Sequence, residues 1–121
     1  MTPNVNIKQM KLIDSPLTKV DFDALATEFG PYFKVTVDIE NKRLVAGPIL
    51  HADGEEVLLA KGSRQDSIWG GGVLVSTLEV DANAVLNIRP RLGNNGTELS
   101  NATRREEFFS AVNELLFSLW K

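Results

Sequence analysis

The chain has 121 residues, of which 43% are hydrophobic, and its formal net charge is -3. This size and apolar content predict one domain spanning residues 1–121 with a single core. The acidic balance argues against nucleic-acid binding over a broad surface, which needs clustered Lys and Arg. The sequence contains no cysteine, so disulfides, thiolate zinc sites and thiol nucleophiles are excluded.

The N-terminal segment lacks the pattern of a secretory leader, and no stretch approaches the roughly 18 apolar residues of a membrane span. We therefore expect a soluble cytoplasmic protein that does not enter a membrane. Apolar and polar residues alternate poorly at the start of the chain, and we expect residues 1–9 to be poorly ordered.

The first expected elements are a short strand over residues 10–13 and a helix that follows it. Thr18 and Asp21 approximate a capping box for the helix, and Gly30 followed by Pro31 ends it. An apolar stripe at helical spacing lies between them: Phe22, Leu25, Ala26 and Phe29.

The clearest strand covers residues 32–40, where apolar and polar residues alternate. Asn41 and Lys42 suit a hairpin turn, so residues 43–50 are the predicted antiparallel partner. Gly47 and Pro48 interrupt that partner and predict a bulge or an edge position there.

The later elements complete the predicted fold. We expect a short helix over residues 54–61, strands over 73–75, 78–80 and 84–89, a polar loop over 90–96, and a long helix from residue 101 to the end. This order alternates too little for a parallel doubly wound sheet. It predicts an α+β fold: an antiparallel sheet of about four to five strands, with the long C-terminal helix and two shorter helices packed on one face.

The stretch HADGEEVLLAKGSRQDSIWGGG, residues 51–72, is rich in side chains that can do chemistry. His51 with Asp53 and either Glu55 or Glu56 could form a metal or acid–base cluster, but one histidine beside acids at a helix start lacks the spacing of metal motifs. Asp53 as N-cap, with Glu56 closing a capping box, explains the acids better. We expect no metal and no cofactor, and His51 stays open between a structural and an acid–base role.

Trp69 and the glycines after it end this stretch. We expect Trp69 to bury its ring against the sheet while its indole N–H finds a partner. Gly70 to Gly72 lack the pattern of a phosphate-binding loop, and a strand is expected after them instead of a helix. Close approach of another element, or a positive φ, explains the glycines without a ligand.

A second polar cluster, NIRPRLGNNGTEL, occupies residues 87–99. Extended geometry would place Asn87, Arg89 and Arg91 on one side of the chain, and the two arginines suit a carboxylate or phosphate. The alternative, slightly favoured in an acidic protein, is internal pairing with nearby carboxylates: Asp53, Glu55 or Glu98.

The last helix carries apolar residues outside its main stripe: Phe109, Leu116, Phe117 and Trp120. A helix covered on one side by its own sheet would leave some of them exposed. A homodimer through this helix and deep burial in the chain's own core are equally weighted explanations.

The two polar stretches resemble the motifs of a family of small prokaryotic proteins, frequent in cyanobacteria, that is classed as a domain of unknown function. The family pattern is HADxExxLLxxGSxQxxxWG followed by NIRPR, and the likeness runs from about residue 32 to the end. The chain departs from it at Gly54, where a bulkier residue is common, and at GTELSN in place of a Ser-x-Glu-Ile-x-Asp run. The resemblance implies that the two stretches belong together, and it implies no reaction.

Three functions stay open. The leading hypothesis is a non-catalytic binding module in which His51, Trp69, Asn87, Arg89 and Arg91 line a pocket for a small anionic ligand or the acidic group of a partner. The second is a small hydrolase or transferase with His51 as general base and Arg89 or Arg91 stabilising negative charge. The third is a homodimeric interaction component of an operon-encoded pair.

Overall fold

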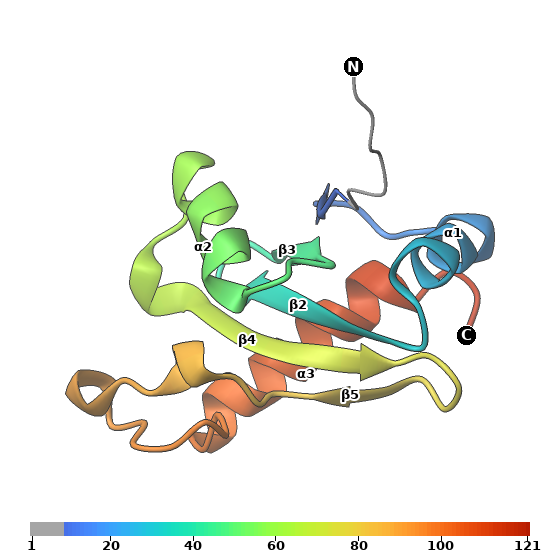
Figure 1. The fold of residues 1–121 in the computed structure, drawn as a ribbon. Helices are drawn as coiled ribbons and strands as arrows, with labels where there is room; N and C mark the ends of the chain where they lie inside the picture. Colours follow the sequence, from blue (N-terminus) through green and yellow to red (C-terminus); the bar gives the residue numbers. More distant parts are fainter. Residues whose placement is uncertain (1–8) are drawn as a thin grey trace.

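The computed structural model describes residues 9–121, and the expectation of poor order at the N-terminus falls on residues 1–8, outside the described part of the chain. Within residues 9–121 the chain forms a five-stranded antiparallel sheet in the order β1-β3-β2-β4-β5 (Figure 1). The strands are β1 (Lys11–Ile13), β2 (Tyr32–Asp38), β3 (Arg43–Ala46), β4 (Ile68–Leu74) and β5 (Glu79–Asp81). The helices are α1 (Lys19–Phe29), α2 (His51–Ala60) and α3 (Ala102–Leu116), with single 3-10 turns η1 (Gln65–Ser67), η2 (Val85–Asn87) and η3 (Pro90–Leu92).

Helix α1 begins and ends where the sequence predicts. The Thr18 hydroxyl accepts a hydrogen bond from the backbone N–H of Asp21, at 3.2 Å, and so caps one of the free donors of the first turn. Gly30 ends the helix with a φ of 91°, a conformation that glycine adopts without a Cβ penalty. The apolar stripe faces the core, where Phe22 and Leu25 are buried.

The hairpin of β2 and β3 forms the centre of the sheet. Its turn covers residues 39–42, and Lys42, with a φ of 53°, takes the left-handed conformation expected for Asn41. Strand β3 ends at Ala46, where the expected partner strand was longer, and β1 pairs with its other side. Gly47, with a φ of 79°, follows the last residue of β3. A Cβ at this position would overlap the ring of Phe29, so glycine allows the end of β3 to pack closely against α1.

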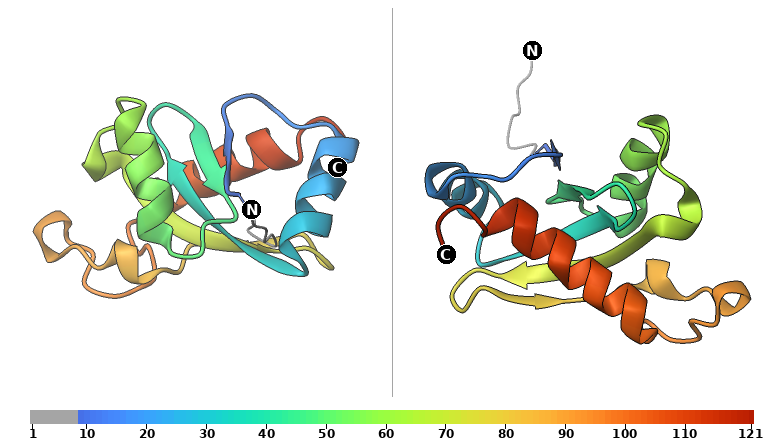
Figure 2. Two further views of the ribbon diagram at one scale, coloured as in Figure 1. Left: turned by 45° about the horizontal axis from the view of Figure 1, so that its top comes forward. Right: turned by 180° about the vertical axis from the view of Figure 1, so that it is seen from behind.

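Both faces of the sheet carry helices. Helices α1 and α3 cover one face, and α3 runs obliquely across the strands when the molecule is seen from behind (Figure 2). Helix α2 covers the other face, where Leu58 packs with Val45 and Ile68. The expectation that all helices share one face is therefore wrong, because Val45 of β3 and Ile68 of β4 point away from α3, are apolar and need cover of their own.

The apolar residues that suggested a homodimer pack against the chain's own core. Leu116 and Phe117 belong to the main core, and Phe109 and Trp120 pack against it. The Trp120 ring lies 5.1 Å from that of Phe22, centroid to centroid. Burial within the chain thus accounts for the residues that suggested a homodimer, without a second copy. No helix among residues 9–121 combines the length and the apolar character needed to cross a bilayer.

Later elements differ from their predicted bounds, and helix α3 ends at Leu116 instead of reaching the end of the chain. Helix α2 begins at His51, three residues before the expected start, and Asp53 is its third residue, not its N-cap. The Asp53 carboxylate accepts from the backbone N–H of Leu50 at 3.3 Å, while Leu50 is the N-cap and offers no side-chain acceptor. Strand β4 includes the glycines that were expected to precede it, and the strand predicted over residues 84–89 is the 3-10 turn η2 and its flanks.

Candidate functional site

Strand β4 contains the end of the first polar stretch and is contacted by side chains of the second. Trp69 and Gly71 face α3, whereas Ile68, Gly70 and Gly72 face α2, because side chains alternate along a strand. Strand β5 pairs only with residues 72–74 of β4. The first half of β4 therefore has an edge that no strand covers.

The side chains of Asn87 and Arg89 cover this edge. The Asn87 amide oxygen accepts from the Gly70 N–H at 2.8 Å, and its amide nitrogen donates to the Gly70 carbonyl at 2.9 Å. Arg89 donates to the backbone carbonyls of Ile68, at 2.6 Å, and Gln65, at 3.0 Å. These bonds satisfy backbone groups that a neighbouring strand would otherwise pair.

Arg89 also forms an internal ion pair. Its guanidinium lies 3.1 Å from the Glu55 carboxylate of α2, and the two side chains are only 11% and 13% exposed. Burial lowers the pKa of Arg89 and Glu55 opposes this shift, but an arginine stays charged in either case. The internal-pairing alternative is thus correct for Arg89 and Glu55, and Arg89 would have to leave these partners to hold an anion.

Arg91 has a different carboxylate partner from Arg89. It pairs with Asp66 at 2.7 Å on the surface, and this bond lowers the pKa of the Asp66 carboxyl. The turn η3 begins at Pro90 and replaces the extended geometry that was expected there, and both arginines reach η1, Arg89 at Gln65 and Arg91 at Asp66. The structure brings Arg91 to η1 and does not bring it to His51.

Trp69 is completely buried on the α3 face of β4. The guanidinium carbons of Arg89 and Arg104 lie 4.7 and 5.3 Å from the indole centroid, within the range of cation–π attraction. Its burial was predicted correctly. The expected partner of its indole N–H is absent among residues 9–121, where Nε1 is a buried polar atom without a hydrogen bond.

The glycines of β4 permit close packing on both faces of the sheet. A Cβ on Gly70 would overlap Ala84 and the His51 ring, and one on Gly71 would overlap the backbone carbonyl of Asp81. A Cβ on Gly72 would overlap the Tyr32 phenol. Close approach of other elements, as the sequence predicts, accounts for all three glycines.

His51 lies at the first position of α2 with its ring on the sheet. Its Nε2 is 2.8 Å from the Gly71 carbonyl oxygen, and the Thr36 hydroxyl donates to the His51 backbone carbonyl at 2.9 Å. Burial lowers the pKa of His51, and the hydrogen bond to Gly71 only partly opposes the shift. His51 is therefore a neutral imidazole near pH 7.

A shallow depression of about 450 Å³ opens beside His51, between α2 and η2. Its walls are mainly apolar, and Leu50 and Val85, 60% and 77% exposed, stand at its rim. Its lining residues are Lys34, Leu50, His51, Ala52, Ala84, Val85 and Leu86. Of the five predicted site residues only His51 lines it, while Trp69, Asn87 and Arg89 support the strand beneath.

Lys34 is the charged residue that the sequence analysis missed. Lys34 lies on β2, opposite Gly72 of β4, and on the face of the sheet that α2 covers. Its positive charge contributes to the lowered pKa of His51. No carboxylate forms an ion pair with Lys34 within residues 9–121. The alternation of apolar and polar residues in this strand already places Lys34 on the face opposite Phe33 and Val35. This alternation is the feature of the sequence from which its position could have been predicted.

Tyr32 closes the β5 side of the same face. Its hydroxyl donates to the Asp81 carboxylate at 2.8 Å. Burial, and then the hydrogen bond and charge of Asp81, raise the pKa of Tyr32 to about 12. The Asp81 carboxylate thus binds the Tyr32 hydroxyl and forms no ion pair with Lys34 within residues 9–121. Lys34 is therefore the cation that lines the depression.

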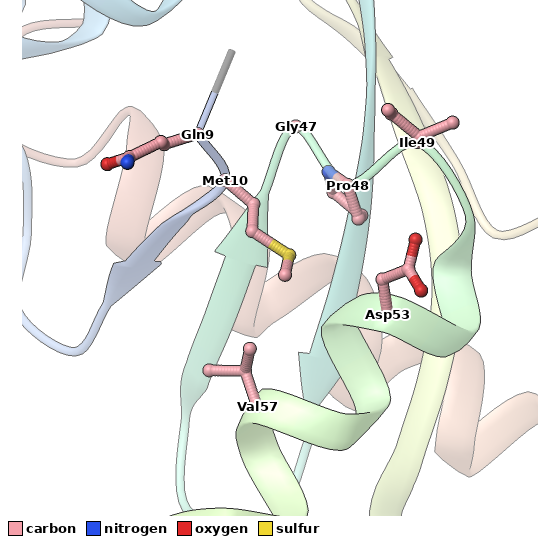
Figure 3. A pocket seen from close by; sticks show the side chains of 7 residues that line it. All are labelled: Gln9, Met10, Gly47, Pro48, Ile49, Asp53 and Val57. Carbon is pink, nitrogen blue, oxygen red and sulfur yellow. The ribbon is translucent and has the colours of Figure 1, made fainter. Parts of the chain in front are cut away.

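A second depression, of about 400 Å³, lies between the residues before β1, the segment that follows β3, and helix α2 (Figure 3). Met10 extends toward Pro48 and Val57 there, and Gln9 points away. The charged group in its lining is the Asp53 carboxylate, which would repel an anion. The depression beside His51 is therefore the better candidate for an acidic ligand.

Residues 9–121 bring together no group of three or more histidine or carboxylate side chains that could hold a metal ion. No curated protein matches the chain, and no solved structure does either. A family model described as "Protein of unknown function (DUF5674)" matches residues 11–115, which include both polar stretches and all of β1 to β5. The chain belongs to this DUF5674 family.

Proposed function

We propose that this protein is a non-catalytic binding module that takes up a small anionic ligand, or the acidic group of a partner, in the depression beside His51. The observation that carries the proposal is the position of Lys34: a cation without an ion pair within residues 9–121, at the wall of a mainly apolar depression. Small-molecule sites combine such apolar walls with a few placed polar groups, and typically measure about 300–1,000 Å³.

Of the predicted site residues, the proposal retains His51, and it assigns the binding of the anion to Lys34 in place of the two arginines. Arg89 is committed to Glu55 and to two backbone carbonyls, and Arg91 is committed to Asp66. Releasing either arginine for a ligand would cost its present bonds, whereas Lys34 has no ion pair within residues 9–121 to lose.

Titration of the isotope-labelled protein with isocaproate, followed by amide NMR, tests this proposal. We expect the largest shifts in residues 50–52 and 84–86, and about tenfold weaker binding after Lys34→Met, because the charge-assisted bond is removed. Lys61→Met is the matched control, since Lys61 is exposed at the end of α2 and outside the lining of the depression. Shifts confined to other parts of the molecule, or unchanged affinity in Lys34→Met, would contradict the proposal.

A further inference from the structure

The His51 ring lies with one edge on the sheet and the other edge turned away from it. Its Cδ2 and Cγ atoms lie 2.8 and 3.1 Å from the point where Gly70 would carry a Cβ, and Nε2 contacts the Gly71 carbonyl. Nδ1 belongs to the opposite edge of the imidazole. Within residues 9–121, Trp69 Nε1 is the one side-chain N or O atom that is both fully buried and without a hydrogen bond. Nδ1 of His51 also makes no hydrogen bond there. Because Nδ1 is not a fully buried atom, it is reached by solvent.

The hydrogen bond to Gly71 decides which nitrogen carries the proton. A carbonyl oxygen only accepts, so Nε2 of the neutral ring carries the hydrogen and Nδ1 presents a lone pair. The charged neighbours of the ring are Lys34 on β2, which favours the neutral form, and Asp81 on β5, which opposes it. Among the described residues, the lining of the depression therefore includes the Lys34 cation, the His51 imidazole with its acceptor nitrogen, and apolar side chains.

We infer that the ligand is a carboxylic acid that carries a hydrogen-bond donor, a hydroxyl or an N–H, beside its carboxylate and has an apolar body. This inference rests on the proposed function and adds the chemical class of the ligand. Lys34 receives the carboxylate, Nδ1 of His51 accepts from the donor, and Leu50, Ala84 and Val85 cover the apolar body.

A phosphate monoester fits this arrangement less well. It would bring two negative charges and only acceptor oxygens, whereas a single lysine faces the depression and Nδ1 is itself an acceptor. The neutral histidine therefore selects against a ligand whose polar atoms are all acceptors.

Paired ligands test the inference on the unaltered protein. Leucate and isocaproate have the same carbon skeleton and differ by the hydroxyl beside the carboxylate, and isocaproamide removes the charge. We expect leucate to bind about three- to tenfold tighter than isocaproate, the worth of one neutral hydrogen bond, and isocaproamide to bind weakest. Equal affinity for leucate and isocaproate at this depression overturns the inference and leaves the proposed function standing. Failure of every acid to bind there overturns the proposed function as well.

Two further arms locate the hydroxyl and its source. His51→Phe keeps a ring over Gly70 and removes Nδ1, so it should abolish the preference for leucate over isocaproate, whatever its effect on the affinity for either ligand alone. N-acetylleucine presents an amide N–H beside its carboxylate, as the C-terminus of a peptide does. It should also bind tighter than isocaproate, and whether it exceeds leucate distinguishes a peptide end from a free hydroxy acid. A preference for leucate that survives in His51→Phe overturns the role of Nδ1.

Discussion

Asn87 binds both backbone groups of Gly70, accepting from its N–H at 2.8 Å and donating to its carbonyl at 2.9 Å. One side chain thus takes the place of a neighbouring strand where β5 no longer reaches β4. Asn87 is itself completely buried, so no water can replace it without rearrangement. A residue first interpreted as a ligand contact therefore has a structural role in closing the sheet edge.

Asn87→Ala should lower the free energy of unfolding by about 2–4 kcal/mol, because it leaves both polar groups of Gly70 buried without partners. Urea unfolding followed by circular dichroism measures this loss. Asn95→Ala is the matched control in the same loop, since Asn95 is exposed, and should change stability by less than about 0.5 kcal/mol. Equal effects in the two variants would show that the Gly70 bonds do not stabilise the fold.

The Arg89 and Glu55 pair ties the loop after η2 to helix α2. Glu55→Ala should cost about 2–3 kcal/mol, because it leaves an almost buried guanidinium without its counter-charge. A double-mutant cycle with Arg89→Ala should give a coupling energy well above that of the exposed Lys19 and Asp23 pair, which we expect at about 0.5 kcal/mol or less. Similar coupling energies in the two cycles would mean that burial adds nothing to the pair.

Periodicity was a good guide wherever a buried stripe is local in the sequence. The stripe of α1, the alternation in β2 and the long helix α3 all follow from spacing alone, and the structure confirms them. The start of α2 was misplaced because Asp53 works from the third helical position, and because the hydroxyl of Thr36, fifteen positions earlier, binds the carbonyl of His51.

The candidate site was harder to predict, because its contacts join distant parts of the chain. Spacing cannot reveal that Arg89 meets Glu55 or that Asn87 meets Gly70, since both depend on how η2 turns beside β4. Glycine has a low preference for strands, which hid the first half of β4. Lys34 was overlooked because an outward residue of a strand is ordinarily solvated, and only the packing of α2 on that face places it at the depression beside His51.

Gly71→Ala should be among the most damaging single changes in the chain. The added Cβ would overlap the backbone carbonyl of Asp81 and also meet the Phe108 ring, and a backbone group cannot move aside as a flexible side chain can. We expect a loss of about 3 kcal/mol or more, or no folded protein, measured by thermal unfolding. Gly96→Ala meets nothing nearby and should leave the midpoint almost unchanged. A stable Gly71→Ala variant would show that β5 can shift away from β4.

Asp38 should make stability depend on acid. It is completely buried at the end of β2, and burial by itself opposes its ionisation. Hydrogen bonds from the Ser63 hydroxyl, the Asn41 side chain and the backbone N–H groups of Asn41 and Glu40 outweigh burial and lower the pKa of Asp38. These bonds hold the turn between β2 and β3.

Since the folded-state pKa of Asp38 lies below its unfolded value of about 3.9, its ionised form stabilises the fold above that pH, and the contribution is lost as pH falls through the folded pKa. Asp38→Asn should therefore be less stable than the unaltered protein at pH 7, and the difference should narrow as the solution is acidified. Urea unfolding over a pH series measures both slopes. Glu40 and Asp66 also have lowered pKa values, so some acid dependence should persist in the variant. If the stability difference between the two proteins stayed constant from neutral to acid pH, the hydrogen bonds of Asp38 would not favour its ionised form over its protonated form.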